Sequence, residues 1–386
     1  MSLSAGQLVG VGRALWRAGI VRPAPPKRIA RSLAMLHHWG PSPAVAYALG
    51  ALRHPDRAAI IDDCGALSFE EVHRRTNALA RAFQSSGIGE DDTVAIMCRN
   101  HRGFIESTVA AFKLGARPVF LPAALDPREL AATLRREDAV AVVYDEEFTG
   151  VLCDGAGGRK RFLAWCEEPD SARPHLLEEL IAGADGRDLP PPIERPLTVT
   201  IVLGGDRSRR PTSRRAPSSL LAPSPLLASL PLRTGETTIM AAPLCHPWGF
   251  AHMKLGMRLA STLVLHREFD PERVLRDVAL HDATALVTLP RTLERIVQLP
   301  REALACHGTS SLRVIAVNGA TLQGELAMPA MAAFGPVLFN LRGESVVRLD
   351  SYWSTQCGRS TDVPAWFAER GASRERRLFP RDVGRS

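Results

Sequence analysis

Short apolar runs alternate with segments of helical period along most of the chain. In the C-terminal half, apolar runs of strand length lie at Thr237–Ala242, Ser261–Leu265, Ala285–Thr288, Leu312–Val317 and Val337–Asn340. Strands separated by helices are typical of an α/β domain with a largely parallel sheet. The turns that follow such strands are where an open α/β sheet holds its ligand. The pattern therefore predicts a ligand-binding α/β domain.

The N-terminal half repeats this alternation, which predicts a doubly wound sheet there too. Strands are expected at Ala58–Ile61, Thr93–Met97, Pro118–Leu121, Val140–Tyr144 and Leu197–Leu203. Ser68 with Glu71, and Asp126 with Glu129, have the spacing of capping boxes at helix starts. The polar segment Glu146–Pro196 is rich in Gly, Pro and Arg, and it is predicted to be a surface excursion with one helix near Pro174–Ile181.

Residues 1–40 form a basic N-terminal arm. Pro26 can begin a helix with Ile29, Leu33 and Leu36 on one face, and Lys27, Arg28 and Arg31 surround that face. Two interpretations are open. The helix packs on its own domain, or its apolar face makes a peripheral membrane contact, which suits an acyl substrate.

Three ordered motifs resemble the adenylate-forming (AMP-binding) ligases. The segment APLCHPWGFAH is similar to their APLFHxxG segment, SLRVIAVNGATL to LRxxxxGGAxL, and FNLRG to the beginning of NxYGxTE. Order and spacing also match, and the fatty-acid–CoA ligase (acyl-CoA synthetase) branch fits best. The resemblance covers about residues 55–341. It implies an α/β fold with two doubly wound, mostly parallel sheets of an adenylate-forming N-terminal domain, without the C-terminal lid domain.

The resemblance also implies partners and site residues. The expected reaction joins a fatty acid to coenzyme A with ATP and Mg²⁺, through an acyl-adenylate. Nucleotide binding is implied for Gly204, Gly205, Gly319, Ala320, Asn340 and Gly343, and an acyl pocket for His246, Trp248 and Gly249. Other interpretations stay open, namely a buried histidine with a backbone partner at His246 and a simple strand-to-helix turn at Gly319–Ala320.

The chain departs from the family at several chemical positions. The phosphate loop reads GGDRSRRPTSRRAPSS and lacks the threonine run and the Pro-Lys-Gly. Arg342 occupies the position of the adenine-stacking tyrosine, and Val346 that of the magnesium-binding glutamate. The ribose-binding segment and the lid lysine have no counterpart. We therefore expect no intact catalytic residue and impaired turnover; the alternative is a non-catalytic protein that binds nucleotide or acyl chain.

The net charge of +7 has a local origin. Asp206–Arg215 contributes +4 and Arg342–Ser386 contributes +3, which leaves the rest of the chain formally neutral, so a nucleic-acid partner is not expected. Both stretches begin inside a family motif and are rich in Arg, Ser, Gly or Pro. We hypothesise frameshifts in GC-rich coding DNA near residues 204–220 and 341. Translating the other frames tests this, because one of them should restore the glycine- and threonine-rich loop and YGxTE.

The expected organisation has five parts: the arm (1–40), a first α/β subdomain (41–203), an aberrant phosphate-loop region (204–229), a second α/β subdomain (230–341) and a divergent, disordered tail (342–386). The seven cysteines show no CxxC pair or zinc spacing, which is typical of reduced cytosolic thiols. With no signal peptide or membrane span expected, the predicted location is cytoplasmic or membrane-associated. His246 and His252 are poorly spaced for a shared metal, and no metal site is predicted.

Overall fold

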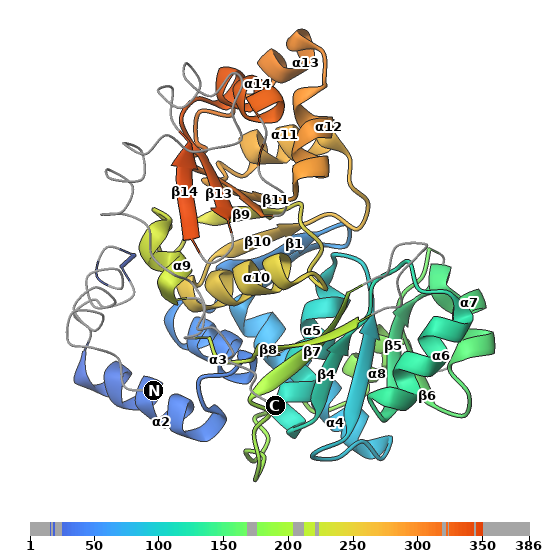
Figure 1. Cartoon of the computed structure of the whole chain (residues 1–386). Coiled ribbons are helices and arrows are strands. Elements are labelled where there is room, and N and C mark those ends of the chain that lie inside the picture. Colours follow the sequence, from blue (N-terminus) through green and yellow to red (C-terminus); the bar gives the residue numbers. More distant parts are fainter. Residues whose placement is uncertain are drawn as a thin grey trace, which may run out of the picture.

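The computed structural model describes residues 25–167, 176–203, 212–220, 224–318, 324–342 and 345–349, together with Trp16, residues 18–19 and Leu322. Two sheets lie one above the other with helices between and outside them (Figure 1). This is the predicted α/β class with two mostly parallel sheets.

The larger sheet, sheet A, has the order β14-β13-β12-β11-β9-β10-β1-β2. All its neighbouring strands from β13 to β1 are parallel, whereas β14 and β2 pair antiparallel with β13 and β1. Its strands are β1 (Ala58–Asp62), β2 (Gly65–Ser68), β9 (Thr237–Met240), β10 (Thr262–Leu265), β11 (Ala285–Thr288), β12 (Val314–Asn318), β13 (Leu338–Arg342) and β14 (Ser345–Leu349).

The smaller sheet, sheet B, has the order β6-β5-β3-β4-β7-β8. The pairs from β6 to β7 are parallel, and β8 is antiparallel to β7. Its strands are β3 (Thr93–Met97), β4 (Arg117–Phe120), β5 (Ala139–Asp145), β6 (Lys160–Trp165), β7 (Thr198–Leu203) and β8 (Thr212–Pro217). β3 is buried at every position and apolar at all but Thr93, as expected of a central strand in a sheet covered on both faces.

The largest core cluster lies between the sheets, and two smaller clusters lie on their outer faces. The central helices are α3 (Pro43–Arg53), α4 (Phe69–Ser85), α5 (Arg102–Leu114) and α10 (Pro247–Leu259). Sheet A is covered outside by α11 (Pro271–Leu280), α12 (Pro290–Val297), α13 (Arg301–Cys306) and α14 (Gly324–Phe334), and sheet B by α6 (Pro127–Arg136) and α7 (Thr149–Gly155). The remaining elements are α2 (Pro26–Trp39), η1 (Glu146–Phe148), α8 (Leu177–Ala182) and α9 (Ser224–Ser229).

The local signals in the sequence correspond to the observed helix ends. Both capping boxes are present: Ser68 Oγ accepts from the Glu71 amide, and Asp126 Oδ1 accepts from the Glu129 amide. Each of these two N-cap bonds stabilises its helix by about 1 kcal/mol. At the other end of a helix, Gly115 ends α5 in the left-handed conformation, with φ 78°.

Long-range pairing and some local elements differ from the sequence-based expectations. Strands β1 and β2 belong to sheet A, although they lie within the predicted first subdomain. The predicted excursion contains α7 and α8, and it also contains β6, which joins sheet B. β8 and α9 occupy the predicted phosphate-loop region, and β14 lies within the predicted disordered tail. For β1, pairing with the distant strand β10 decides which sheet it joins, whereas β8 and β14 each pair with the strand directly before them.

The apolar face of α2 is not packed on the domain. Ile29, Leu33 and Leu36 are 47%, 60% and 37% exposed, whereas Ser32 and Trp39 are buried. α2 nevertheless contacts its own domain on its other side, because Trp39 is buried and His38 Nε2 donates to the carbonyl of Leu189 at 2.9 Å. Among the described helices, none is both long and apolar enough to cross a membrane.

Candidate functional site at the carboxyl edge of sheet A

The carboxyl ends of β9, β11, β12 and β13 meet at one edge of sheet A because these strands are parallel neighbours. The structure brings four of the predicted site residues to this edge: His246, Trp248, Gly249 and Asn340. Gly204, Gly205, Gly319, Ala320 and Gly343 lie outside the described residues. Strand β7 precedes the predicted phosphate loop, and the second half of that loop forms β8, which pairs antiparallel with β7.

His246 is the N-cap of α10, and Pro247 follows at the first helical position. The Trp248 amide donates to Nδ1 of His246 at 3.2 Å. Because Nδ1 accepts a hydrogen bond, the neutral ring carries its proton on Nε2. Burial lowers the pKa of His246, which favours this neutral form. The half-buried side chain therefore offers an N–H donor at the sheet edge.

Gly249 permits the close approach of the turn that precedes α10. A Cβ atom at this position would lie 2.0 Å from the carbonyl oxygen of Pro243 and 2.7 Å from its carbonyl carbon. These are backbone atoms of the same turn and cannot move aside as a flexible side chain could. The turn Pro243–Gly249 therefore requires glycine at its end.

Trp248 and His252 lie one helical turn apart on the buried face of α10. Their rings contact each other edge to face, with centroids 4.1 Å apart. The indole N–H of Trp248 donates to the carbonyl of Ala316 on β12 at 3.4 Å. His252 Nδ1 lies 3.1 Å from the carbonyl of Trp248 and donates to it. Nε2 of His252 is thus a bare acceptor, and it is buried without a partner.

Asn340 supplies a second buried atom without a partner. It pairs in register with Val317 of β12 and is 2% exposed. Its side-chain oxygen Oδ1 has no hydrogen-bond partner. A buried orphan acceptor is costly unless a ligand or water donates to it. Asn340 Oδ1 is therefore available to a hydrogen-bond donor at this edge.

A clamp on the Pro243–Gly249 turn was not predicted from the sequence. Asn100, in the loop after β3, donates from Nδ2 to the carbonyls of Met240 and Ala242 at 3.0 and 2.9 Å. Its Oδ1 accepts from the amide of Leu244 at 2.8 Å. One side chain thus holds the turn by three hydrogen bonds from another sheet. The available signal was a polar cluster, Arg99–Arg102, directly after a buried strand.

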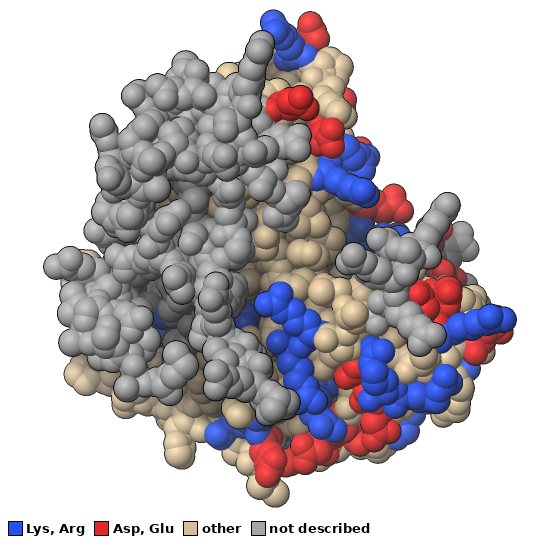
Figure 2. Space-filling view, in the orientation of Figure 1, with Lys and Arg blue, Asp and Glu red and all other residues tan. Residues whose placement is uncertain are grey.

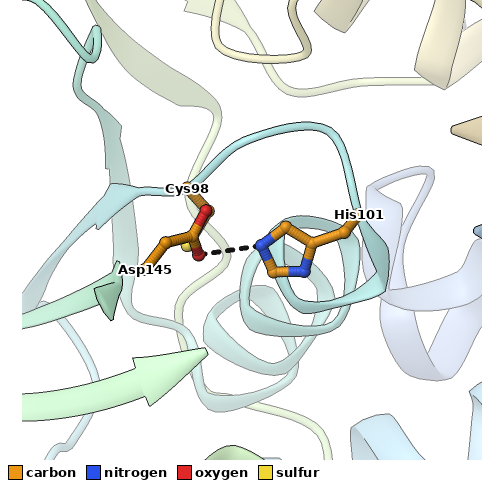
Figure 3. Close-up of side chains that lie close together, drawn as sticks. All are labelled: Cys98, His101 and Asp145. Carbon is orange, nitrogen blue, oxygen red and sulfur yellow. Dashed lines mark hydrogen bonds and ion pairs between the residues drawn. The ribbon is translucent and has the colours of Figure 1, made fainter. Parts of the chain in front are cut away.

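A buried network fixes the loop that carries Asn100 (Figure 3). Asp145, at the carboxyl end of β5, accepts from His101 Nε2 and from the Arg99 amide, both at 2.8 Å. Cys98 also bonds to this carboxylate, and burial, the main cause, with the nearby Asp145 charge, raises the pKa of its thiol. Asp145 and His101 are 0% exposed.

Cys98, His101 and Asp145 lie close enough to hold a metal ion, since their ligand atoms are all within 4.8 Å of one another. The hydrogen bonds oppose this. The Gly103 amide donates to His101 Nδ1 at 3.1 Å, so Nε2 carries the ring proton and donates it to Asp145. A metal-bound histidine instead donates its second nitrogen's proton to an acceptor. The network therefore has the hydrogen-bond pattern of a structural anchor.

Cys245 is not a nucleophile at this edge. Burial raises the pKa of its thiol to about 11, so the reactive thiolate is scarce at neutral pH.

On the face drawn in Figure 2, positive and negative side chains are intermixed across the lower right. Arg99 and Arg267 both form ion pairs with Glu147.

The fold and the site define a class of protein: a two-sheet α/β domain with unpaired polar atoms at the carboxyl edge of its larger sheet. The sequence matches the family of AMP-binding enzymes over residues 49–188 and 222–363. The chain belongs to this family. The match omits residues 189–221, which include the aberrant phosphate loop, and extends past residue 341.

Relatives agree at the level of the family. Feruloyl-CoA synthase of Amycolatopsis sp is 26% identical over 274 residues, covering 71% of this chain and 53% of its own. Pyochelin synthase PchD of Pseudomonas aeruginosa is 35% identical over 114 residues, covering 29% and 21%. The crystal structure of the N-terminal domain of FACL13 from Mycobacterium tuberculosis aligns with a TM-score of 0.70 at 16% identity, covering 82% and 81%. The matched region thus spans about half or less of these two curated relatives.

Proposed function

We propose that this chain contributes the acid- and nucleotide-binding domain of a carboxylic acid–CoA ligase that forms an acyl-adenylate and then a thioester. The observation that carries the proposal is that one sheet edge presents both a histidine N–H donor, His246, and an acceptor without a partner, Asn340 Oδ1. Family membership supports the reaction class. ATP, when bound, supplies the phosphorus that the carboxylate attacks, and coenzyme A supplies the thiol.

The chain's own residues bind and orient in this mechanism. His246 donates from Nε2 to an oxygen of the substrate carboxylate. Its ring is neutral, so it orients the carboxylate by a hydrogen bond and not by an ion pair. Asn340 accepts a hydrogen bond from the adenine amino group through Oδ1. Asn100 holds the Pro243–Gly249 turn in place, because preorganised groups contribute to a transition state without reorganisation. Val346 has no side-chain oxygen to coordinate Mg²⁺ at the position where the family has a glutamate, and we assign no other residue to the metal.

The identity of the carboxylic acid substrate is also part of the proposal. The sequence resemblance favours a fatty acid, whereas feruloyl-CoA synthase and 2-succinylbenzoate–CoA ligase act, by their names, on aromatic acids. Gly204, Gly205, Gly319, Ala320 and Gly343 are proposed to contact the nucleotide through their backbone. The second candidate is a protein that binds nucleotide or acyl chain without turnover, favoured by Arg342 and Val346 at positions where the family has a tyrosine and a glutamate.

Pyrophosphate release separates the two candidates. The purified chain is given ATP, Mg²⁺ and a panel of fatty and aromatic acids, and an ATP-dependent shift in melting temperature is measured in parallel. Release that requires an acid supports the ligase, and a melting shift without release supports binding alone. Asn340→Ala is expected to abolish the melting shift, and Asn100→Ala to weaken acid-dependent release at least tenfold. Neither release nor shift in the unmodified chain contradicts both candidates.

The exposed apolar face of α2 supports a peripheral membrane contact. Ile29, Leu33 and Leu36 are exposed beside the exposed cations Lys27, Arg28 and Arg31, a combination that suits an anionic lipid surface. Flotation with phosphatidylserine-containing vesicles is expected to recover the chain, and Leu33→Glu to reduce recovery. Equal recovery of both proteins, or none of either, rejects the contact.

A further inference from the structure

Beneath α10, a line of residues runs inward from the carboxyl edge of sheet A. Trp248 stands first, His252 follows one turn later, and Leu255 and Leu259 complete the helix. Trp248 is 3% exposed, and its indole spans the space from α10 to the Ala316 carbonyl of β12. An acyl chain entering from the Pro243–Gly249 turn and running under α10 would therefore meet the indole first.

The space behind the indole is almost filled. The edge-to-face contact with Trp248 places the imidazole of His252 directly behind it. Past His252 is a cavity with a volume of about 10 Å³, lined mainly by apolar side chains from α10 and sheet A together with Thr238, His252 and Ser261. That volume holds about one water molecule. The passage is thus occupied by two rings and ends in a site for a single small polar molecule.

The end of the passage differs chemically from an apolar tunnel. His252 Nε2 is buried and unpartnered, and burial lowers the pKa of the ring to about 4. At neutral pH the uncharged ring accepts a hydrogen bond at this atom. A methylene chain pressed against it would leave the acceptor unsatisfied, which costs free energy. Sterics and polarity therefore both act against a long alkyl chain.

We propose that Trp248 is the floor of the acid pocket and restricts the substrate to compact carboxylic acids, either aromatic or short-chain, while excluding long-chain fatty acids. This inference rests on the proposed function, because it assumes that the acid binds at the Pro243–Gly249 turn. His252 and the small cavity form a second compartment, which the indole separates from the substrate.

Direct acid binding tests the floor without requiring turnover. Dissociation constants for benzoate, cinnamate, hexanoate and decanoate are measured by isothermal titration calorimetry on the whole chain and its variants. The unmodified chain is expected to bind benzoate, cinnamate or hexanoate at least tenfold more tightly than decanoate. Trp248→Ala is expected to improve decanoate binding relative to benzoate roughly tenfold or more, since two newly buried methylenes suffice for that change.

Two variants serve as matched controls. Phe250→Ala removes a buried ring from the same helix, but this ring packs on Phe120 of sheet B with centroids 5.1 Å apart. His252→Ala enlarges only the compartment behind the indole. Both are expected to leave the order of preference among the acids unchanged. The double variant Trp248→Ala with His252→Ala is expected to accept longer chains than Trp248→Ala alone.

Tight decanoate binding by the unmodified chain would overturn the inference, as would an unchanged preference in Trp248→Ala. A shift produced equally by Phe250→Ala would do the same, and so would a failure of every acid to bind. Trp248→Leu keeps more of the packing and replaces Trp248→Ala if that variant does not fold. Pyrophosphate release, measured separately, reports on the proposed ligase activity. Size-selective binding without release thus rejects the ligase while the floor stands.

Discussion

The carboxyl edges of the two sheets use polar residues in opposite ways. At the edge of sheet B, Asp145 receives hydrogen bonds from His101, from the Arg99 amide and from Cys98. At the edge of sheet A, His252 Nε2 and Asn340 Oδ1 are buried without partners. Trp165 Nε1 is the exception at the edge of sheet B. The satisfied cluster anchors a loop, whereas Asn340 Oδ1 remains available to a donor and His252 lines the small cavity behind the indole of Trp248.

Breaking the anchor is expected to give the largest effect. Asp145→Ala leaves the Arg99 amide and the His101 N–H without an acceptor in a site with no solvent access. Each buried donor left without an acceptor costs about 1–3 kcal/mol, so the free energy of unfolding is expected to fall by about 2–6 kcal/mol. Urea denaturation measures the change. Asp154→Ala, which removes an exposed carboxylate from α7, is the control and is expected to change stability by less than about 0.5 kcal/mol. A small loss in Asp145→Ala would show that the cluster is not an anchor.

The second prediction concerns the turn of sheet A. Gly249→Ala places a methyl group against backbone atoms of Pro243 and is expected to lower the free energy of unfolding by about 2–3 kcal/mol. Gly150→Ala is the matched control, because Gly150 also lies near a helix start but a Cβ there meets nothing within 4 Å. It is expected to be neutral or slightly stabilising. Equal effects of both variants in the same denaturation assay would refute the close approach.

The smallest effect concerns acid sensitivity at the open edge. The pKa of His252 is lowered to about 4 by burial, against about 6.5 when unfolded. Between these values the unfolded chain binds the additional proton, so stability falls as the pH drops from 6.5 towards 4. Between pH 7.5 and 5, the free energy of unfolding is expected to fall by about 1–2 kcal/mol less in His252→Leu than in the unmodified chain. Thermal unfolding at both pH values measures the difference, and identical losses would contradict it.

Local chemistry made much of the fold predictable. The capping boxes at Ser68 and Asp126 depend on residues three positions apart, and the strands of sheet A have continuous apolar runs. The partner of β1 could not be found in this way, because β10 lies about two hundred residues later and periodicity carries no pairing information. The strand β6 was missed for the same reason: it lies in a segment whose Gly, Pro and charged residues predict loops.

The candidate site divides along the same line. His246, Trp248 and Gly249 could be placed in one turn from the sequence because they are adjacent. The clamp by Asn100 could not, since it joins residues 140 to 144 positions apart. The two histidines of α10 also look alike in sequence, yet one accepts at Nδ1 and the other donates from it. Backbone geometry at the helix start and in its second turn decides the tautomer, and residue identity does not.

The β1–β2 hairpin has a consequence for how the chain is made on the ribosome. Its partner β10 ends at Leu265, so the hairpin is synthesised long before the strand that shelters it. During that interval the edge of β1 that later pairs with β10 is unpaired and available to other nascent chains or to a chaperone. If the two halves were expressed as separate polypeptides, cut near residue 203, the hairpin would be on the N-terminal polypeptide and its partner β10 on the C-terminal one.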